Sequence, residues 1–475
     1  MISHAKRPSA PMRYDLTRLP LLKPLLRSRW PQLLFQIMAL GGFVFAILAG
    51  LVGTPVGNHN FSIVFVWIAW WALLMLIAVP LFGRGWCSIC PIPVPGEWLQ
   101  RGAVLKPSGR GPSAGSGRGL SWGRRWPRRL RNLWLQNGAF ALVALFSAVV
   151  LTQPRVTGIM LAAFLFIAVG TSLIFERRAF CRYLCPVGGF IGLYSQLAPV
   201  EVRVKDPALC VAHTPKTCYL GSDDGYGCPW QVFPGRLMKN TYCGLCVECL
   251  RTCPYDNVAV NLRPFGADLQ HPTGRRLDEA FKAFILLGSV LAYSAVMLGP
   301  WGALKSAAYA VGTAAWLGYA LTFLILIFGL LPGLFWIAVR AGQVFARSNT
   351  PTRQTFIAFA YALIPLGLAA WIAFSLAFVF ANLSYLWPAL SDPFGWGWNL
   401  FGTTSMAWTP YLTRVIPALQ TLALLGGLMW ASATAHQVAG EQSPSVGQAS
   451  GLSQSLPVIL FCLLVTLALL GLLVG

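Results

Sequence analysis

Four cysteines and a proline lie close together in the run YCGLCVECLRTCP at residues 242–254. The spacing is C-x2-C-x2-C-x3-C-P, which places thiols at Cys243, Cys246, Cys249 and Cys253. In a tight loop the first three thiolates can each bind one iron of a cubane cluster, and the fourth normally binds a second cluster. A zinc ribbon would instead need two separated C-x2-C pairs. The run therefore predicts a [4Fe-4S] site.

A less regular set of cysteines precedes this run, namely Cys210, Cys218 and Cys228, the last followed by Pro229. In two-cluster proteins the ligands cross between the two halves of the motif. By that arrangement Cys228 completes the site formed by the first three cysteines of the later run. Cys253 then joins Cys210 and Cys218, so the second site lacks one thiolate.

Three outcomes stay open for this second site. A side chain such as His213 or Asp206 could supply the missing ligand. The site could instead hold a three-iron cluster. In the third case no second cluster forms, and these cysteines bind zinc or nothing.

Two further cysteine pairs, in RGWCSICP and RAFCRYLCPVGG, each directly follow an apolar segment and precede a proline. Because proline ends a helix, the chain turns there and both pairs can face one shared site. The candidate metal ligands are Cys87, Cys90, Cys181 and Cys185. The alternative is a pair of dithiols that bind no metal or are redox-active. Guanidinium groups that could offset thiolate and cluster charge belong to Arg84, Arg177, Arg178 and Arg182.

The elements around these cysteines are those of a membrane protein. Mean hydropathy is +0.62 and 11% of the 475 residues are charged, against about 25% in soluble domains. Apolar runs of about 20 residues predict spanning helices. The nine candidates are residues 32–53, 61–82, 133–153, 157–175, 281–300, 308–338, 355–381, 413–434 and 455–474.

The net charge of +22 is distributed as a topology signal. With a cytoplasmic N-terminus, nine helices leave 33 of the 36 Lys and Arg inside, and only Arg155, Lys305 and Arg414 outside. This bias predicts orientation in the cytoplasmic membrane, with contact to anionic lipid as a secondary role. It excludes nucleic acid as the expected partner, because no nucleic-acid-binding motif accompanies the charge.

The predicted fold is mainly α, a polytopic membrane protein with a small ferredoxin-like α+β domain inserted between the fourth and fifth helices. Eleven of the twelve cysteines then lie on the cytoplasmic side, where metal binding is favoured over disulfides. No clear internal repeat is evident. The predicted parts are a basic N-terminus (1–31), a four-helix region (32–199) with a basic linker (101–132), the iron–sulfur domain (200–278) and a five-helix region (279–475).

Together these features resemble the membrane-bound polyferredoxins of the NapH, MauN and NosR type, over residues 60–265. The ferredoxin run and the C-x3-C-P element that ends at Pro186 carry the resemblance, whereas the pair at Cys87 and Cys90 is one residue short. The resemblance implies electron transfer between a quinone pool or cytoplasmic donor and a redox partner. It leaves the five C-terminal helices uncovered.

Three functions follow from these observations. The first is an electron-transfer subunit of a quinone-linked oxidoreductase rather than a stand-alone enzyme. The second is a maturation factor that uses cysteine pairs to serve a redox metalloenzyme, and the third is a redox-sensing transporter. Phosphate-loop, zinc-protease and dinucleotide-binding motifs are absent from the sequence. The five histidines are too dispersed for a two-haem relay across the membrane.

Overall fold

A computed structural model of the chain describes residues 13–105, 120–271, 274–442 and 448–474. The centre of the basic linker, for which the sequence predicts disorder, lies outside these residues. In the described part, eight helices are long and apolar enough to cross a membrane. They are α2 (Trp30–Val52), Phe61–Ile89, α8 (Pro154–Ile174), Leu277–Leu298, Ala314–Phe345, Thr352–Ser391, α20 (Ile416–Gln442) and Gly451–Leu473, which lies in α21 (Gln448–Leu473).

Several of these spans are composed of shorter helical stretches. Phe61–Ile89 begins with α3 (Phe61–Ile63), continues through π-helical turns and ends with α4 (Trp86–Ile89). The later spans contain α13 (Leu277–Tyr293), α15 (Ala314–Ile325), α16 (Leu331–Phe345), α17 (Thr352–Ala360), α18 (Leu363–Asn382) and α19 (Leu386–Ser391). The short α14 (Gly302–Tyr309) joins two of them.

The sequence predicts nine spanning helices, and the candidate at residues 133–153 is the one that differs. It divides at Phe146 into α6 (Trp134–Leu145) and α7 (Ser147–Val150). At 1.5 Å per residue the two together rise about 25 Å, less than the bilayer core of about 30 Å. The structure therefore has eight long candidate spans and one shorter, broken segment.

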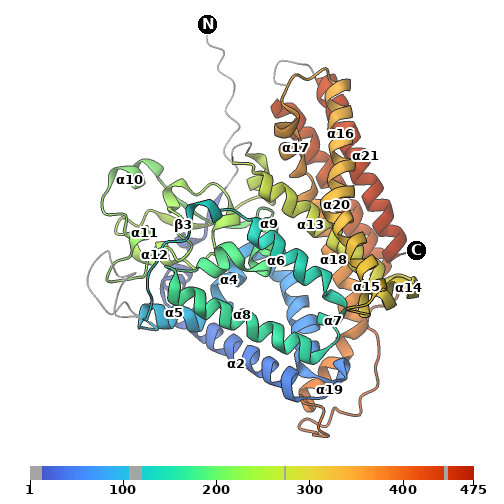
Figure 1. The fold of residues 1–475 in the computed structure, drawn as a ribbon. Coiled ribbons are helices and arrows are strands. Elements are labelled where there is room, and N and C mark those ends of the chain that lie inside the picture. Colours follow the sequence, from blue (N-terminus) through green and yellow to red (C-terminus); the bar gives the residue numbers. More distant parts are fainter. Residues whose placement is uncertain (1–12, 106–119, 272–273, 443–447, 475) are drawn as a thin grey trace.

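This broken segment still runs from one end of the helix assembly to the other. At its start, Gln136 donates a hydrogen bond to the Cys181 carbonyl at 3.0 Å. Beyond its end, Thr152 is so close to Gly57 that a Cβ on the glycine would lie 2.5 Å from the Thr152 carbonyl oxygen. The segment consequently returns the chain to α8, which packs against α2 (Figure 1).

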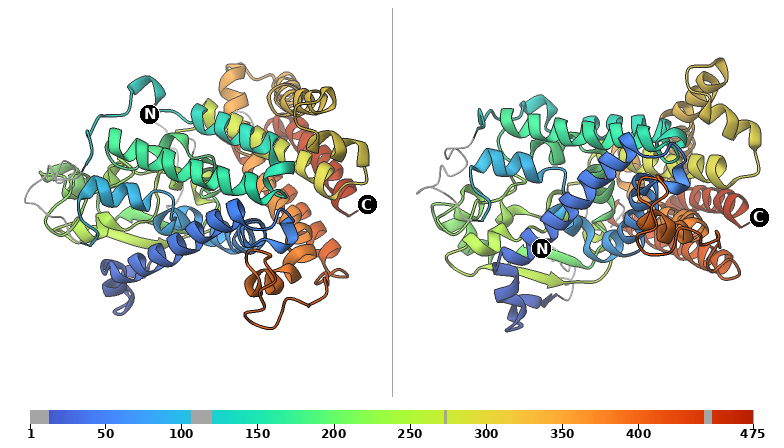
Figure 2. Two further views of the ribbon diagram at one scale, coloured as in Figure 1. Left: turned by 60° about the horizontal axis from the view of Figure 1, so that its bottom comes forward. Right: turned by 90° about the horizontal axis from the view of Figure 1, so that it is seen from below.

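The small domain contains a three-stranded antiparallel sheet in the order β1-β3-β2. Its strands are β1 (Tyr14–Asp15), β2 (Val200–Val204) and β3 (Val258–Leu262). Three short helices, α10 (Pro207–Ala212), α11 (Thr217–Leu220) and α12 (Glu248–Thr252), carry or flank the cysteines. In both views of Figure 2 this domain lies on the left and the red C-terminal helices on the right.

The apolar core of this domain is small and includes thiols. It consists of Val202, Cys218, Val247, Cys249, Leu250, Val258 and Val260. Beside it, Arg263 pairs with Glu201 at 2.9 Å and also with Asp268, while Arg203 pairs with Asp268 at 3.1 Å. All four side chains are buried.

The N-terminal segment is part of the small domain rather than a separate basic tail. Tyr14 faces Leu262 in the sheet, and Arg13 pairs with Glu201 at 2.7 Å. In α1 (Leu22–Arg27), Lys23 pairs with Asp256 at 2.7 Å. Because residues 13–29 and β3 meet, an even number of crossings must separate them. The shorter segment α6–α7 therefore supplies the crossing between the second long span and α8.

Candidate metal centres

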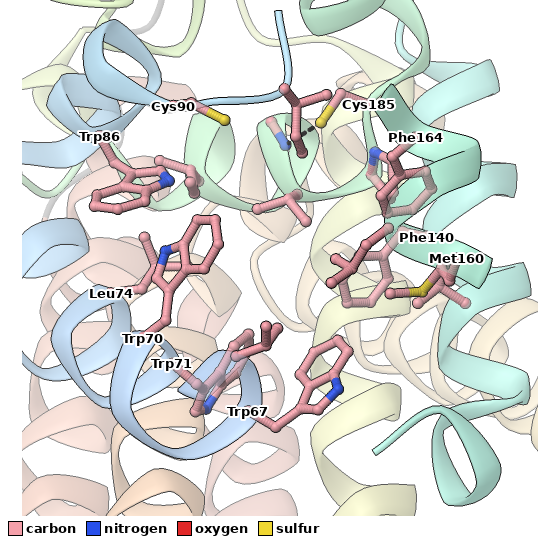
Figure 3. A pocket seen from close by; sticks show the side chains of 18 of the residues that line it. Trp67, Trp70, Trp71, Leu74, Trp86, Cys90, Phe140, Met160, Phe164 and Cys185 are labelled. Carbon is pink, nitrogen blue, oxygen red and sulfur yellow. Dashed lines mark hydrogen bonds between the residues drawn. The ribbon is translucent and has the colours of Figure 1, made fainter. Parts of the chain in front are cut away.

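Four cysteines line one pocket where two membrane helices end, and we call this group the membrane-edge site. They are Cys87, Cys90, Cys181 and Cys185. Cys87 lies in α4, and Cys90 ends that helix before Pro91. Cys181 lies in a π-helical turn, and Cys185 caps α9 (Pro186–Tyr194). Figure 3 shows the sulfurs of Cys90 and Cys185 at the same end of the pocket.

Local backbone geometry explains how these thiols are presented. Pro91 and Pro186 each follow a cysteine with extended backbone, so the chain turns at both points. The Gly188 backbone N–H donates to the Cys185 sulfur at 3.2 Å. Burial raises the pKa of Cys185 to about 11. Burial and the neighbouring Cys87 and Cys185 thiols likewise raise the pKa of Cys90. Buried thiols this close together need a positive ion to exist as thiolates.

A buried ion pair supports the membrane-edge site from the solvent side. Arg178 contacts Glu97 of α5 (Val94–Arg101) through two hydrogen bonds, at 2.5 and 2.7 Å. The same guanidinium donates to the Cys87 carbonyl at 2.5 Å. Burial would raise the pKa of Glu97, but the charges of Arg101 and Arg178 outweigh it and hold that pKa below its ordinary value. Glu97 therefore stays ionised and fixes Arg178 beside the cysteines.

Below the cysteines the same pocket is lined almost entirely by apolar side chains, many of them aromatic (Figure 3). Its cavity volume is about 130 Å³. The aromatic lining includes Trp67, Trp70, Trp71, Trp86, Phe140 and Phe164, with Met160 and Leu74 beside them. We call this part the aromatic pocket.

Five indole N–H groups belong to this lining, and that of Trp371 donates to the Leu286 carbonyl at 3.1 Å. Those of Trp67 and Trp71 donate to the hydroxyls of Thr157 and Ser375, each at 3.0 Å. The rings of Trp70 and Trp86 lie 5.1 Å apart, near the cysteines (Figure 3). Neither of these two indole N–H groups donates a hydrogen bond to any described residue.

A second group of four thiols, which we call the central site, lies inside the small domain. Cys228, Cys243, Cys246 and Cys249 line one enclosed apolar pocket. Burial raises the pKa of Cys243 to about 11 and that of Cys246 to about 12, and the nearby Cys228 thiol adds to both. Cys228 is thus beside the first three cysteines of the ferredoxin run, as the crossed arrangement predicts.

The third group, the distal site, contains Cys210, Cys218 and Cys253. Asn257 links two of them, since its side-chain N–H donates to the Cys210 sulfur at 3.2 Å and its backbone N–H to the Cys253 sulfur at 3.3 Å. Burial raises the pKa of Cys218 to about 12, and the Cys210 and Cys253 thiols add to this rise. The structure therefore gathers the three thiols that remain after the central site is formed.

The two candidates for the missing fourth ligand have other partners. The Asp206 carboxylate caps α10, where it accepts a hydrogen bond from the Ala208 backbone at 2.8 Å. The His213 ring packs against Tyr255, with the ring centres 4.9 Å apart. Within the described residues, no three His, Cys, Asp or Glu side chains converge closely enough to hold a single metal ion.

Arginines connect the membrane-edge site to the central site. Arg84 donates to the Thr241 carbonyl and lies 3.5 Å from the Cys181 carbonyl. The Arg178 backbone N–H donates to the Pro229 carbonyl at 3.1 Å, and Arg177 donates to the Cys228 carbonyl at 2.7 Å. Each of these contacts joins a residue near one group of thiols to a residue near the other. The central site therefore lies next to the membrane-edge site.

The thiol chemistry of the central site suits an iron–sulfur cluster, and one buried atom gives independent support. The indole Nε1 of Trp230 lies in the wall of this pocket, is fully buried and has no hydrogen-bond partner among the described residues. A cluster in this cavity would offer sulfur acceptors to that N–H. The residues present therefore fit a [4Fe-4S] group at the central site.

Three residues beside the thiol groups have roles that the cysteine pattern does not predict, namely Glu97, Trp230 and Lys282. Glu97 is the only acidic residue between residues 83 and 132, and Trp230 directly follows Cys228 and Pro229. These two positions in the sequence could have identified both residues as candidates. Lys282 falls at the start of the predicted spanning helix 281–300. Lys282 is a buried residue of α13. Its ammonium group donates to the Gln136 side-chain oxygen at 3.0 Å, and the Gln136 amide donates to the Cys181 carbonyl of the membrane-edge site.

Comparison with known families bears on the membrane-edge site. A family model described as a 4Fe-4S binding domain matches the chain twice, at residues 63–110 and 157–204. Each match contains a spanning helix followed by one of the two cysteine–proline pairs. This repetition corrects the expectation that the chain has no internal repeat. The repeat is hidden in the sequence because the two pairs differ by one residue in spacing.

Two curated relatives share this region. The chain is 28% identical over 128 residues to YccM of Escherichia coli (strain K12), which carries the name of an electron transport protein, covering 26% of this chain and 32% of that protein. It is 28% identical over 158 residues to the methylamine utilization ferredoxin-type protein MauN of Paracoccus denitrificans (strain Pd 1222), covering 29% of this chain and 50% of that protein.

These matches confirm the predicted resemblance to polyferredoxins of the MauN type. The matched stretch spans about a third and a half of the lengths of the two relatives. No solved structure matches the chain.

Proposed function

We propose that this chain is a membrane-bound iron–sulfur protein that passes electrons between a quinone in the aromatic pocket and a redox partner at the cytoplasmic surface. The observation that carries the proposal is the order of the three thiol groups. The membrane-edge site opens into the aromatic pocket, the central site adjoins it through the arginines, and the distal site shares an apolar core with the central one. Such an order suits stepwise electron transfer.

In this proposal each thiol group has an assigned ligand role. Cys87, Cys90, Cys181 and Cys185 hold a cluster at the membrane edge, and Cys228, Cys243, Cys246 and Cys249 hold a [4Fe-4S] cluster at the central site. Cys210, Cys218 and Cys253 hold a second cluster of the small domain, with three thiolates. A bound cluster supplies reversible one-electron chemistry. The chain contributes thiolates, backbone N–H groups and the arginines that offset their charge.

The aromatic pocket is the proposed quinone site because its lining matches what such a ring needs. Ligand pockets are mostly apolar, with a few polar groups that orient the ligand. Here the indole N–H groups of Trp70 and Trp86 have no partner among the described residues and lie near the cysteines. They can donate hydrogen bonds to a quinone carbonyl, which would place the ring next to the membrane-edge site.

The small domain is proposed to face the cytoplasm, with residues 13–29 and 200–278 on one side of the inner membrane. The charge bias of the connecting segments supports this orientation. We expect a reporter fused near residue 230 to behave as cytoplasmic, and one fused near residue 395 to behave as external, when enzymatic reporters of each compartment are compared. The reverse pattern would overturn the orientation but not the ligand assignments.

The experiment that tests the proposal is an EPR-monitored redox titration of anaerobically purified protein with iron and sulfide counting. We expect about eight irons per chain from the two four-thiolate sites, and three or four more if the distal site is filled. Interacting signals should appear on reduction. Reduction by a short-chain quinol should develop the same signals, and Met160→Trp should slow this reaction by filling the aromatic pocket.

Other outcomes would point elsewhere. About four irons with one isolated signal would leave a single working cluster. The membrane-edge cysteines would then act as dithiols, as expected for a maturation factor that uses cysteine pairs. Full iron content with no reduction by any quinol would keep the electron carrier but remove the quinone from the proposal.

A further inference from the structure

Trp230 lines the central site, and its ring packs against Arg84, which also lies 3.5 Å from the Cys181 carbonyl of the membrane-edge site. Its side chain is 1% exposed and lines the central pocket together with the four thiols of that site. It also belongs to the large apolar core that contains Cys87, Cys181 and Cys185.

The ring is held from two sides. A Cβ added to Gly244 would lie 2.0 Å from the Trp230 Nε1 atom, so the indole edge rests directly on the loop between Cys243 and Cys246. On one face, the Arg84 guanidinium lies 4.2 Å from the ring centre. The Trp230 carbonyl accepts a hydrogen bond from Arg182. These contacts leave the ring little freedom to turn its N–H elsewhere.

The orientation leaves a buried donor without an acceptor in the protein. The Nε1 atom has no hydrogen-bond partner among the described residues, although indole N–H groups usually find one when buried. By contrast, the indole of Trp126, also buried, donates to the Leu130 carbonyl at 3.0 Å. An orphaned donor in the wall of a cavity with four thiols calls for an acceptor inside that cavity.

We propose that the Trp230 indole N–H donates a hydrogen bond to a sulfur atom of the cluster held at the central site, and thereby makes that cluster easier to reduce. The inference rests on the proposed function, since it requires a cluster there. The acceptor is an inorganic sulfide or a cysteine sulfur of the cluster.

The electrostatic reason concerns the extra electron. Reduction adds one electron and so one negative charge to the cluster, with no atom gained or lost. The positive end of the N–H dipole stabilises that added charge more than it stabilises the oxidised state, and hydrogen bonds to sulfur are known determinants of cluster potential. Trp230 is thus a positioning and tuning residue, not a ligand.

Trp230→Phe removes the N–H and keeps a ring beneath Arg84. We expect the variant to retain its iron and sulfide while the midpoint potential of the central cluster falls. A tenfold weaker reduction equilibrium corresponds to about 59 mV for one electron. The matched control is Trp126→Phe, which also removes an indole N–H from a buried ring and should leave the potential unchanged.

A measurement on the unaltered protein protects the test against a variant that fails to fold. Protein grown with indole-¹⁵N tryptophan should show a ¹⁵N hyperfine coupling to the reduced central cluster in pulsed EPR. The coupling should be lost in Trp230→Phe and kept in Trp126→Phe. Absence of any coupling in the labelled unaltered protein would overturn the inference.

The failures can be told apart. A central cluster that is present, with an unchanged potential in Trp230→Phe and no ¹⁵N coupling, would sink this inference and leave the electron-transfer proposal intact. A protein without any cluster at Cys228, Cys243, Cys246 and Cys249 would sink both, and iron counting reports that outcome directly.

Discussion

Cys246→Ser is expected to remove the central cluster, lowering the iron content by about four atoms per chain and stopping electron transfer between the membrane-edge and distal sites. Cys246 lines the central pocket with three other thiols and belongs to the same apolar core as the membrane-edge cysteines. A serine hydroxyl is a poor iron ligand by comparison with a thiolate. The measurement is iron and sulfide counting together with the visible absorbance of the purified variant.

The matched control for this change is Cys462→Ser. Cys462 is fully buried in α21 and belongs to none of the three thiol groups. That variant should keep its full iron content and its absorbance. Unchanged iron in Cys246→Ser, with iron equally unchanged in the control, would show that the central ligand assignment is wrong.

Glu97→Gln is expected to cost about 3–5 kcal/mol in the free energy of unfolding, the range found when one partner of a buried ion pair is removed. The change leaves Arg178 buried without its carboxylate, next to the Cys87 carbonyl. Because the Arg178 backbone N–H donates to the Pro229 carbonyl, a displaced Arg178 should also loosen the contact between the membrane-edge and central sites. Denaturant unfolding in detergent, followed by cluster absorbance, measures the loss.

The control is Asp256→Asn, which removes an acidic residue from an exposed ion-pair group with Lys23 and Arg27. Surface pairs are worth about 0–1 kcal/mol, so this change should be small. Equal losses in the two variants would contradict the special role of the buried pair.

The same pair predicts a pH dependence with a definite sign. The pKa of Glu97 is lower in the folded protein than its ordinary value, because Arg101 and Arg178 outweigh the effect of burial. Its contribution to stability is therefore present above the ordinary carboxyl pKa, about 4.3, and is lost as pH falls through the lower folded value. Glu97→Gln should lack this component of acid sensitivity.

The spacing of the cysteines predicts how they group. The pairing of Cys228 with the ferredoxin run, and of Cys253 with Cys210 and Cys218, follows from ligand crossing between two halves of a motif. In the structure Cys228 lines one pocket with the first three cysteines of the run, and Asn257 contacts both Cys210 and Cys253. The ligand assignments themselves stay a prediction. Hydropathy was enough for eight of the nine spans, because each is a continuous apolar run.

Features that depend on contacts between distant segments could not be predicted. The break at Phe146 lies inside an apolar run that looks uniform in the sequence. The aromatic pocket combines side chains from five spans or more, each unremarkable in its own segment. The role of Gly244 depends on a tryptophan that approaches from another loop. Amino-acid composition carries no information on such contacts between distant segments.

The pairing of β1 with β3 has a consequence for biosynthesis. Lys23 and its partner Asp256 are 233 residues apart in the chain, so at about 5–20 residues per second the ribosome needs roughly 12–50 s to deliver the partner. During that interval the four intervening membrane segments must be inserted. The sheet can close only afterwards, so β1 and α1 stay without their partners in the small domain while these segments are inserted.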